Sequence, residues 1–104
     1  MIKSYELLKI IQFLEEHGIK NYSINEDGIV DVDGNVNLYD KNLTSIPIQF
    51  GRVSGWFDCE SNKLTTLEGA PQSVGDWFDC RNNKKKFTEQ EVRELSEVGG
   101  SIYC

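Results

Sequence analysis

The sequence is poor in positive charge. Its 104 residues contain 11 Lys and Arg against 17 Asp and Glu, which gives a formal net charge of -6. A nucleic-acid-binding surface needs a basic face to neutralise phosphates. The only basic run is Lys84, Lys85 and Lys86, which is typical of a solvated turn. We therefore expect no direct binding of nucleic acid.

Long apolar runs are also missing. The first segment, "MIKSYELLKIIQFLEEHG", interrupts its apolar positions with Lys3, Glu6, Lys9 and Glu15. This pattern fits neither a secretory signal nor a membrane span. Without an export signal, a reducing compartment is expected, in which the three cysteines stay free thiols. We expect a cytoplasmic protein that does not associate with a membrane.

Residues that commonly carry catalysis or bind metals are few. The only histidine is His17, and the three cysteines lack the short paired spacing typical of a zinc site. A catalytic cysteine needs an electropositive setting and a base. Asp31, Asp33 and Asp40 lack the twelve-residue spacing of a calcium loop that ends in glutamate. We expect no enzymatic activity, no metal and no cofactor.

What the sequence does contain is a repeat. The tetrapeptide WFDC occurs at 56–59 and again at 77–80, 21 residues later, and the same shift aligns Asn62 with Asn83. Shifting backwards identifies 36–53, "VNLYDKNLTSIPIQFGRV", as a diverged first copy. The strand returns in "GGSIYC" after a longer spacing of 24 residues. A period of this length predicts a solenoid.

One copy, "FDCESNKLTTL", fits the leucine-rich-repeat framework L-x-L-x-x-N-x-L, with Phe57, Cys59, Asn62 and Leu64 at its defining positions. Together with "LTTLEGAPQSVGDWFDC", it resembles the short, cysteine-bearing leucine-rich repeats of uncharacterised bacteriophage proteins. The resemblance covers residues 22–104. It implies a parallel-strand solenoid and a general binding role, such as modulation or inhibition of a host or defence protein, while fold alone names no activity.

We expect a single α+β domain, a small leucine-rich-repeat-like solenoid with a parallel sheet of about four strands. Residues 1–34 form a cap of one helix and a β-hairpin, 35–87 hold the repeats, and 88–104 form a C-terminal cap. Within the repeats, turns or short 3₁₀ pieces are expected through "LTTLEGAP". The asparagine of each repeat is expected to bond backbone groups of its loop.

The first cap has helical and turn signals. Apolar residues recur at helical spacing from Tyr5 to Leu14, with Ser4 as a candidate N-cap and Gly18 as the stop. Hairpin turns are predicted at Asp27-Gly28 and at Asp33-Gly34.

The second cap begins with Thr88, and Glu91 three residues later completes a capping-box pattern. Val92, Leu95 and Val98 are expected to form the apolar face of this helix. The helix should lead directly into the last strand, "SIYC".

Strand alternation assigns the two halves of WFDC to opposite faces. It sends Phe57 and Cys59 inward, and places Cys59 in one inward column with Leu38, Cys80 and Cys104. A cysteine that exchanges with leucine acts as a small buried hydrophobe.

The outward residues define a candidate binding surface on the concave side of the sheet. Tryptophan, tyrosine and arginine often anchor interfaces. The alternative is a ladder of stacked rings and paired polar groups that supports the sheet itself. The candidate binding residues are Tyr39, Trp56, Asp58, Glu60, Trp77, Asp79, Arg81 and Tyr103.

Two functional hypotheses follow. The favoured one is a noncatalytic protein-protein interaction module, which the phage resemblance suggests engages a host or defence protein in the host cytoplasm. The alternative is a structural or assembly protein, such as a virion component, that uses the same face for self-association. We expect a monomer or a weak homo-oligomer.

Overall fold

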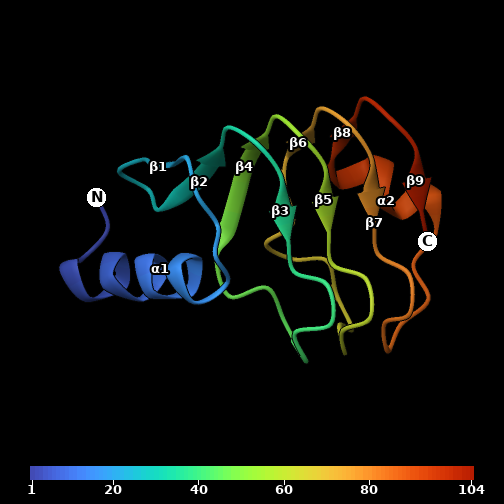
Figure 1. Ribbon diagram of the computed structural model, residues 1–104, viewed down its shortest axis with the longest axis horizontal. Coiled ribbons are helices and arrows are strands. Elements are labelled where there is room, and N and C mark those ends of the chain that lie inside the picture. Colours follow the sequence, from blue (N-terminus) through green and yellow to red (C-terminus); the bar gives the residue numbers. More distant parts are fainter.

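The computed structural model describes all residues, 1–104, and shows a solenoid of short parallel strands with a helix toward each end (Figure 1). Each coil supplies one strand to each of two sheets, which form opposite walls of the molecule. The small α+β repeat solenoid expected from the sequence is confirmed. A second sheet was not expected.

The first sheet has the order β1-β2-β4-β6-β8 and contains β1 (Tyr22–Ile24), β2 (Ile29–Val32), β4 (Gln49–Val53), β6 (Ser73–Val74) and β8 (Glu97–Val98). β1 and β2 form an antiparallel hairpin, and every other pair is parallel. The register stacks Val53 on Val74 and Val74 on Val98. The turns predicted through "LTTLEGAP", residues 64–71, are confirmed, without a 3₁₀ piece, and β6 follows this segment.

The second sheet is the one that the repeat predicted. It has the order β3-β5-β7-β9 and contains β3 (Val36–Asn37), β5 (Phe57–Asp58), β7 (Phe78–Asp79) and β9 (Ile102–Tyr103). All its strands are parallel. Phe57 pairs with Phe78 and Asp58 with Asp79, so equivalent residues of successive copies lie side by side.

The hydrophobic core lies between the two sheets. Phe50 from the first sheet contacts Phe57 from the second at 5.5 Å between ring centroids, and Phe57 contacts Phe78 at 5.3 Å. All three are fully buried. A tight corner brings the coils together at Gly75, where a Cβ atom would collide with the backbone oxygen of Ser54. Coil-to-coil contact therefore requires glycine there.

Helix α1 (Ser4–Glu16) closes the N-terminal end, with Phe13 and Leu14 contributing to the core. The prediction that Ser4 is the N-cap is wrong, because Lys3 holds that position and no side chain caps the helix. Gly18 ends the helix with φ +63°, as predicted. No helix in the molecule has both the length and the apolar character needed to cross a membrane.

The two Asp-Gly turns behave differently. Asp27-Gly28 lies in the hairpin between β1 and β2, where Asn25 Oδ1 accepts the backbone N–H groups of Asp27 and Ile29, each at 2.9 Å. The prediction of a hairpin turn at Asp33-Gly34 is wrong. This segment is a corner that takes the chain from β2 to β3 in the other sheet, because β4 already occupies the free edge of β2.

Helix α2 (Glu89–Leu95) has the predicted capping box, in which Thr88 and Glu91 bond reciprocally. Its predicted apolar face is wrong in part: Val92 is buried, but Leu95 is 40% exposed and Val98 belongs to β8. The helix also does not lead directly into the last strand. The chain first crosses the first sheet as β8, since each coil must pass through both walls.

Candidate binding surface on the second sheet

Most of the predicted surface residues gather on the outward side of the second sheet. We call the set formed by Trp56, Asp58, Glu60, Trp77, Asp79, Arg81 and Tyr103 the aromatic-acidic face. It is assembled by the parallel register, which sets Asp58 beside Asp79 and Asp79 beside Tyr103. Tyr39 follows β3 and is 48% exposed, but it makes no ring contact with the others.

The tryptophans form a parallel stack. The ring centroids of Trp56 and Trp77 lie 4.7 Å apart with an interplanar angle of 4°. Tyr103 continues the row, edge-on to Trp77 at 6.2 Å and 71°. In the preceding coil, the position equivalent to Trp56 is occupied by Asn35, whose Oδ1 accepts the Trp56 backbone N–H at 2.9 Å. One ring face of Trp56 therefore has no aromatic partner.

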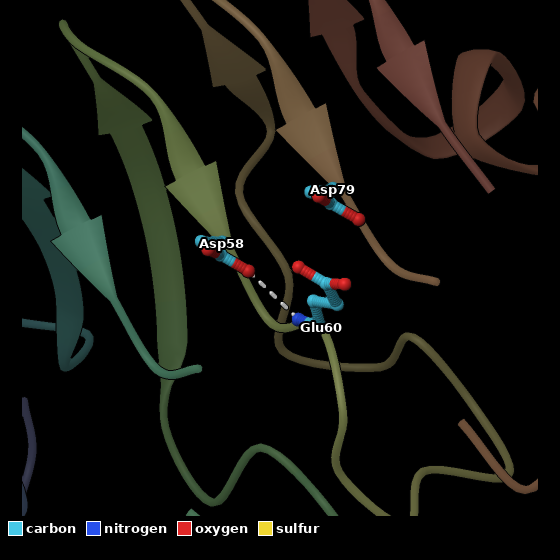
Figure 2. Close-up of side chains that lie close together, drawn as sticks. All are labelled: Asp58, Glu60 and Asp79. Carbon is cyan, nitrogen blue, oxygen red and sulfur yellow. Dashed lines mark hydrogen bonds between the residues drawn. The ribbon is translucent and has the colours of Figure 1, made fainter. Parts of the chain in front are cut away.

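The aspartates of the two WFDC segments cap the ends of their strands. Asp58 Oδ1 accepts the Glu60 backbone N–H at 2.9 Å (Figure 2), and Asp79 Oδ1 accepts that of Arg81 at 3.1 Å. Asn37 makes the same bond to Tyr39 at 3.0 Å in the first coil. Each is a local Asx-type turn. Sequence reasoning missed this role, although Asn37 occupies the aspartate position of the repeat.

Arg81 forms an ion pair inside the face. Its Nε donates to Asp79 Oδ1 at 3.1 Å and its Nη2 to Asp79 Oδ2 at 2.7 Å, a bidentate arrangement. The prediction that Asp79 is a surface residue is wrong, because this ion pair lies over it and it is buried. Arg81 Nη2 also lies 3.8 Å from Glu60 Oε1, and Arg81 Cζ lies 5.0 Å from the centre of the Tyr103 ring. Arg81 thus links the carboxylates to the aromatic row.

The carboxylates outnumber this one cation. Oxygen atoms of Asp58, Glu60 and Asp79 lie within 4.8 Å of one another (Figure 2). Partial burial, followed by the charge of Asp79, raises the pKa of Asp58 against the opposing effect of its bond from Glu60 N–H. Partial burial and the Asp79 carboxylate also raise the pKa of Glu60. The face carries negative charge that Arg81 does not fully compensate.

Carboxylate oxygens are ligands that calcium and magnesium prefer. Here both Asp79 oxygens already accept bonds from Arg81, and Asp58 Oδ1 caps the backbone at Glu60. The cluster is therefore organised as an ion-pair and turn-capping network.

The inward cysteine column is confirmed for two of its three thiols. Leu38, Cys59 and Cys80 are buried core residues. Burial raises the pKa of Cys59 well above its usual value and that of Cys80 to about 12. The burial predicted for Cys104 is wrong, because this residue continues the column past β9, at the edge of the sheet, and is exposed.

The repeated asparagines support the loops below the face, as predicted. Asn62 Oδ1 accepts backbone N–H groups of Lys41 and Leu43 at 3.0 and 2.9 Å. Its Nδ2 donates to the carbonyls of Leu38 and Cys59 at 2.7 and 3.1 Å. Asn83 repeats the pattern one coil later. These bonds fix the chain where it leaves each strand of the second sheet.

Comparisons with protein-family models, with curated proteins and with solved structures found no match for this chain. The resemblance to phage leucine-rich repeats stays a prediction from the sequence. The geometry of the aromatic-acidic face carries the functional argument.

Proposed function

We propose that the protein is a noncatalytic interaction module that binds a basic segment of a partner protein through the aromatic-acidic face. The observation that carries this proposal is the Trp56–Trp77 stack, which lies beside three carboxylates whose charge one arginine compensates only in part. Aromatic anchors dominate many interfaces because they bury a large area with few rotatable bonds. Carboxylates beside them select for basic partners.

The unpartnered ring face of Trp56 suits a cationic side chain. A lysine or arginine placed over this ring gains a cation-π contact. The carboxylates of Asp58 and Glu60, on the same coil, would pair with its charge. The net charge of -6 would also steer a basic segment toward the molecule.

The size of the face limits how such a partner binds. Parallel strands lie about 4.8 Å apart, so four strands span roughly 15 to 20 Å. The contact would fall at or below the usual ~800 Å² per partner. Affinity would then depend on a few anchors, chiefly the two tryptophans.

The phage-like repeat pattern suggests the class of partner. A host or defence protein in the bacterial cytoplasm, inhibited or otherwise modulated by this chain, is the partner that we propose. The alternative is an assembly role in which the face associates with a second copy. It is favoured by the aromatic row, which continues to Tyr103 on β9, an edge strand of the sheet.

An affinity experiment separates the two roles. We expect immobilised wild-type protein to retain a specific partner from a bacterial lysate and the Trp56→Ala/Trp77→Ala double variant to lose it. Glu68→Gln, an exposed change in a loop outside the face, is the matched control and should retain the partner. Calorimetry with the purified partner then measures direct binding. Equal retention by the double variant contradicts the proposal.

Light scattering across a concentration series tests the alternative directly. A wild-type monomer at all concentrations supports a module for a different partner. A dimer or larger oligomer that is lost in the tryptophan double variant instead supports self-assembly.

A further inference from the structure

Two thiols lie side by side at the C-terminal end of the solenoid. Cys80 follows β7 and Cys104 follows β9, whose register pairs Asp79 with Tyr103. The Cys80 backbone N–H donates to the Tyr103 carbonyl at 2.8 Å, so the register places Cys104 next to Cys80, one residue beyond the last pair. Neighbouring strands lie about 4.8 Å apart. Disulfides join Cα atoms about 4.4 to 6.8 Å apart, which includes this spacing.

The two thiols share one hollow on the surface. Cys80 and Cys104 line it together with the cationic side chains of Arg81, Lys85 and Lys86. Cys104 is exposed, so a reagent from solution reaches its sulfur first. Arg81 and Lys85 are paired with Asp79 and Glu91, so Lys86 is the cation of this hollow that remains to attract an anionic reagent such as glutathione disulfide.

Cys59 lies in the same column but in a different setting. It is fully buried, and β5 is held between β3 and β7. A disulfide brings Cβ atoms to about 3.8 Å, closer than the strand spacing of about 4.8 Å. One residue of the pair must therefore move. Cys104 lies outside the last paired position of β9 and can make this adjustment, whereas Cys59 cannot without disturbing the core.

We propose that Cys80 and Cys104 form a reversible disulfide that fastens the last coil to the preceding one under oxidising conditions. The Cys104 thiolate attacks one sulfur of glutathione disulfide, forming a mixed disulfide and releasing one glutathione thiolate. Cys80 then loses its proton to water and attacks the Cys104 sulfur, which releases the second glutathione. The protein loses two hydrogen atoms, and glutathione disulfide is reduced to two glutathione molecules.

The bond would act on an edge of the sheet. β9 is an edge strand and pairs only with β7, through Phe78–Ile102 and Asp79–Tyr103. A cross-link from 80 to 104 restricts the unfolded chain over this whole segment. The high pKa of Cys80, about 12 because of burial, makes the second step slow near neutral pH and faster as pH rises.

The test incubates the reduced, folded protein with glutathione disulfide, quenches free thiols by alkylation, and measures the intact mass and the peptide map. We expect a monomer lacking two hydrogen atoms, with Cys80 joined to Cys104 and Cys59 alkylated after unfolding. We also expect the melting temperature to rise by roughly 5 °C or more and to return to its starting value after reduction with dithiothreitol.

Variants keep this test specific. Cys59→Ala should still form the bond, whereas Cys104→Ser should show no change of mass or of melting temperature. Three outcomes would overturn the proposal: a covalent dimer through Cys104, a stable glutathione adduct with Cys80 still free, or a bond between Cys59 and Cys80. Because the wild-type peptide map decides among them, the proposal does not depend on how well any variant folds.

Discussion

At the scale of single residues, the aspartate of WFDC combines two roles that favour different side chains. As a turn cap, Asp58 accepts the backbone N–H two residues later, and Asn37 makes the same bond in the first coil. The ionised form of the Asp58 carboxyl group is disfavoured by partial burial and by the neighbouring Asp79, which raise its pKa. The cap stabilises the fold, whereas the charge does not, and it would serve the recognition that we propose.

The change Asp58→Asn separates these roles. A carboxyl whose pKa is raised on folding stabilises the protein below its unfolded value, here 3.8, and loses that contribution as pH rises through the higher folded value. Asparagine keeps the cap and does not ionise. At pH 7 we therefore expect stability within about 0.5 kcal/mol of wild type or above it, measured by urea unfolding.

The stability of the wild type relative to Asp58→Asn should increase as the pH falls from neutrality toward 4. Asp58→Ala is the matched control, since it removes charge and cap together, and should cost about 1 kcal/mol at pH 7. If the asparagine variant is as unstable as the alanine variant, the capping role is wrong.

Asn62 is the other residue whose position makes a sharp prediction. It accepts backbone bonds from Lys41 and Leu43 and donates to carbonyls of two coils, and it is buried. Asn62→Ala leaves these groups without partners and should cost about 1 to 3 kcal/mol. Asn83 accepts one such bond and is less buried, so Asn83→Ala should cost less in the same denaturation series. Equal, negligible losses would contradict the supporting role of the asparagines.

At the scale of elements, the repeat predicted the strands that carry WFDC and failed to predict their partners in the other wall. β5 and β7 lie within the two copies of the tetrapeptide WFDC, so a shift of 21 aligns them directly. β6 is only Ser73–Val74, flanked by residues with little strand preference. Its conformation comes from pairing with β4 and β8, a tertiary effect that local propensity does not contain.

The helices show the same division between local and tertiary signals. The capping box of α2 was predictable because it depends only on residues three apart, Thr88 and Glu91.

Thr88→Ala should cost about 0.5 to 2 kcal/mol of unfolding free energy, because the Glu91 N–H loses its acceptor. Thr65→Ala, an exposed loop change, is the control, and an equal effect of both would argue against the cap.

At the scale of the whole molecule, parallel register makes a surface predictable as a set of residues. Once WFDC was assigned to neighbouring strands, Trp56 had to lie near Trp77 and Asp58 near Asp79. The bidentate pairing of Arg81 with Asp79 and the exposure of Cys104 were not predictable. They depend on rotamers and on where the stack of coils stops, which the repeat pattern does not describe.

The parallel stack also predicts how much each tryptophan truncation should destabilise the fold. Stacked aromatic pairs contribute about 0.5 to 1.5 kcal/mol beyond the area they bury, so Trp56→Ala and Trp77→Ala should each destabilise the fold moderately. Phe57→Ala should cost more, about 3 to 5 kcal/mol, because Phe57 is fully buried between the sheets. Thermal unfolding of the three variants measures this order.

Partner affinity should show the opposite order when measured by calorimetry on folded variants. Each tryptophan truncation should weaken binding by about 2 kcal/mol or more, whereas Phe57→Ala should leave affinity nearly unchanged at a temperature where it is folded. Asp58→Lys should slow association with a basic partner, because Asp58 is partly exposed, whereas Asp79 is buried and paired with Arg81. If the tryptophan variants unfold as readily as Phe57→Ala yet keep full affinity, the stack is a structural ladder and binding lies elsewhere on the molecule.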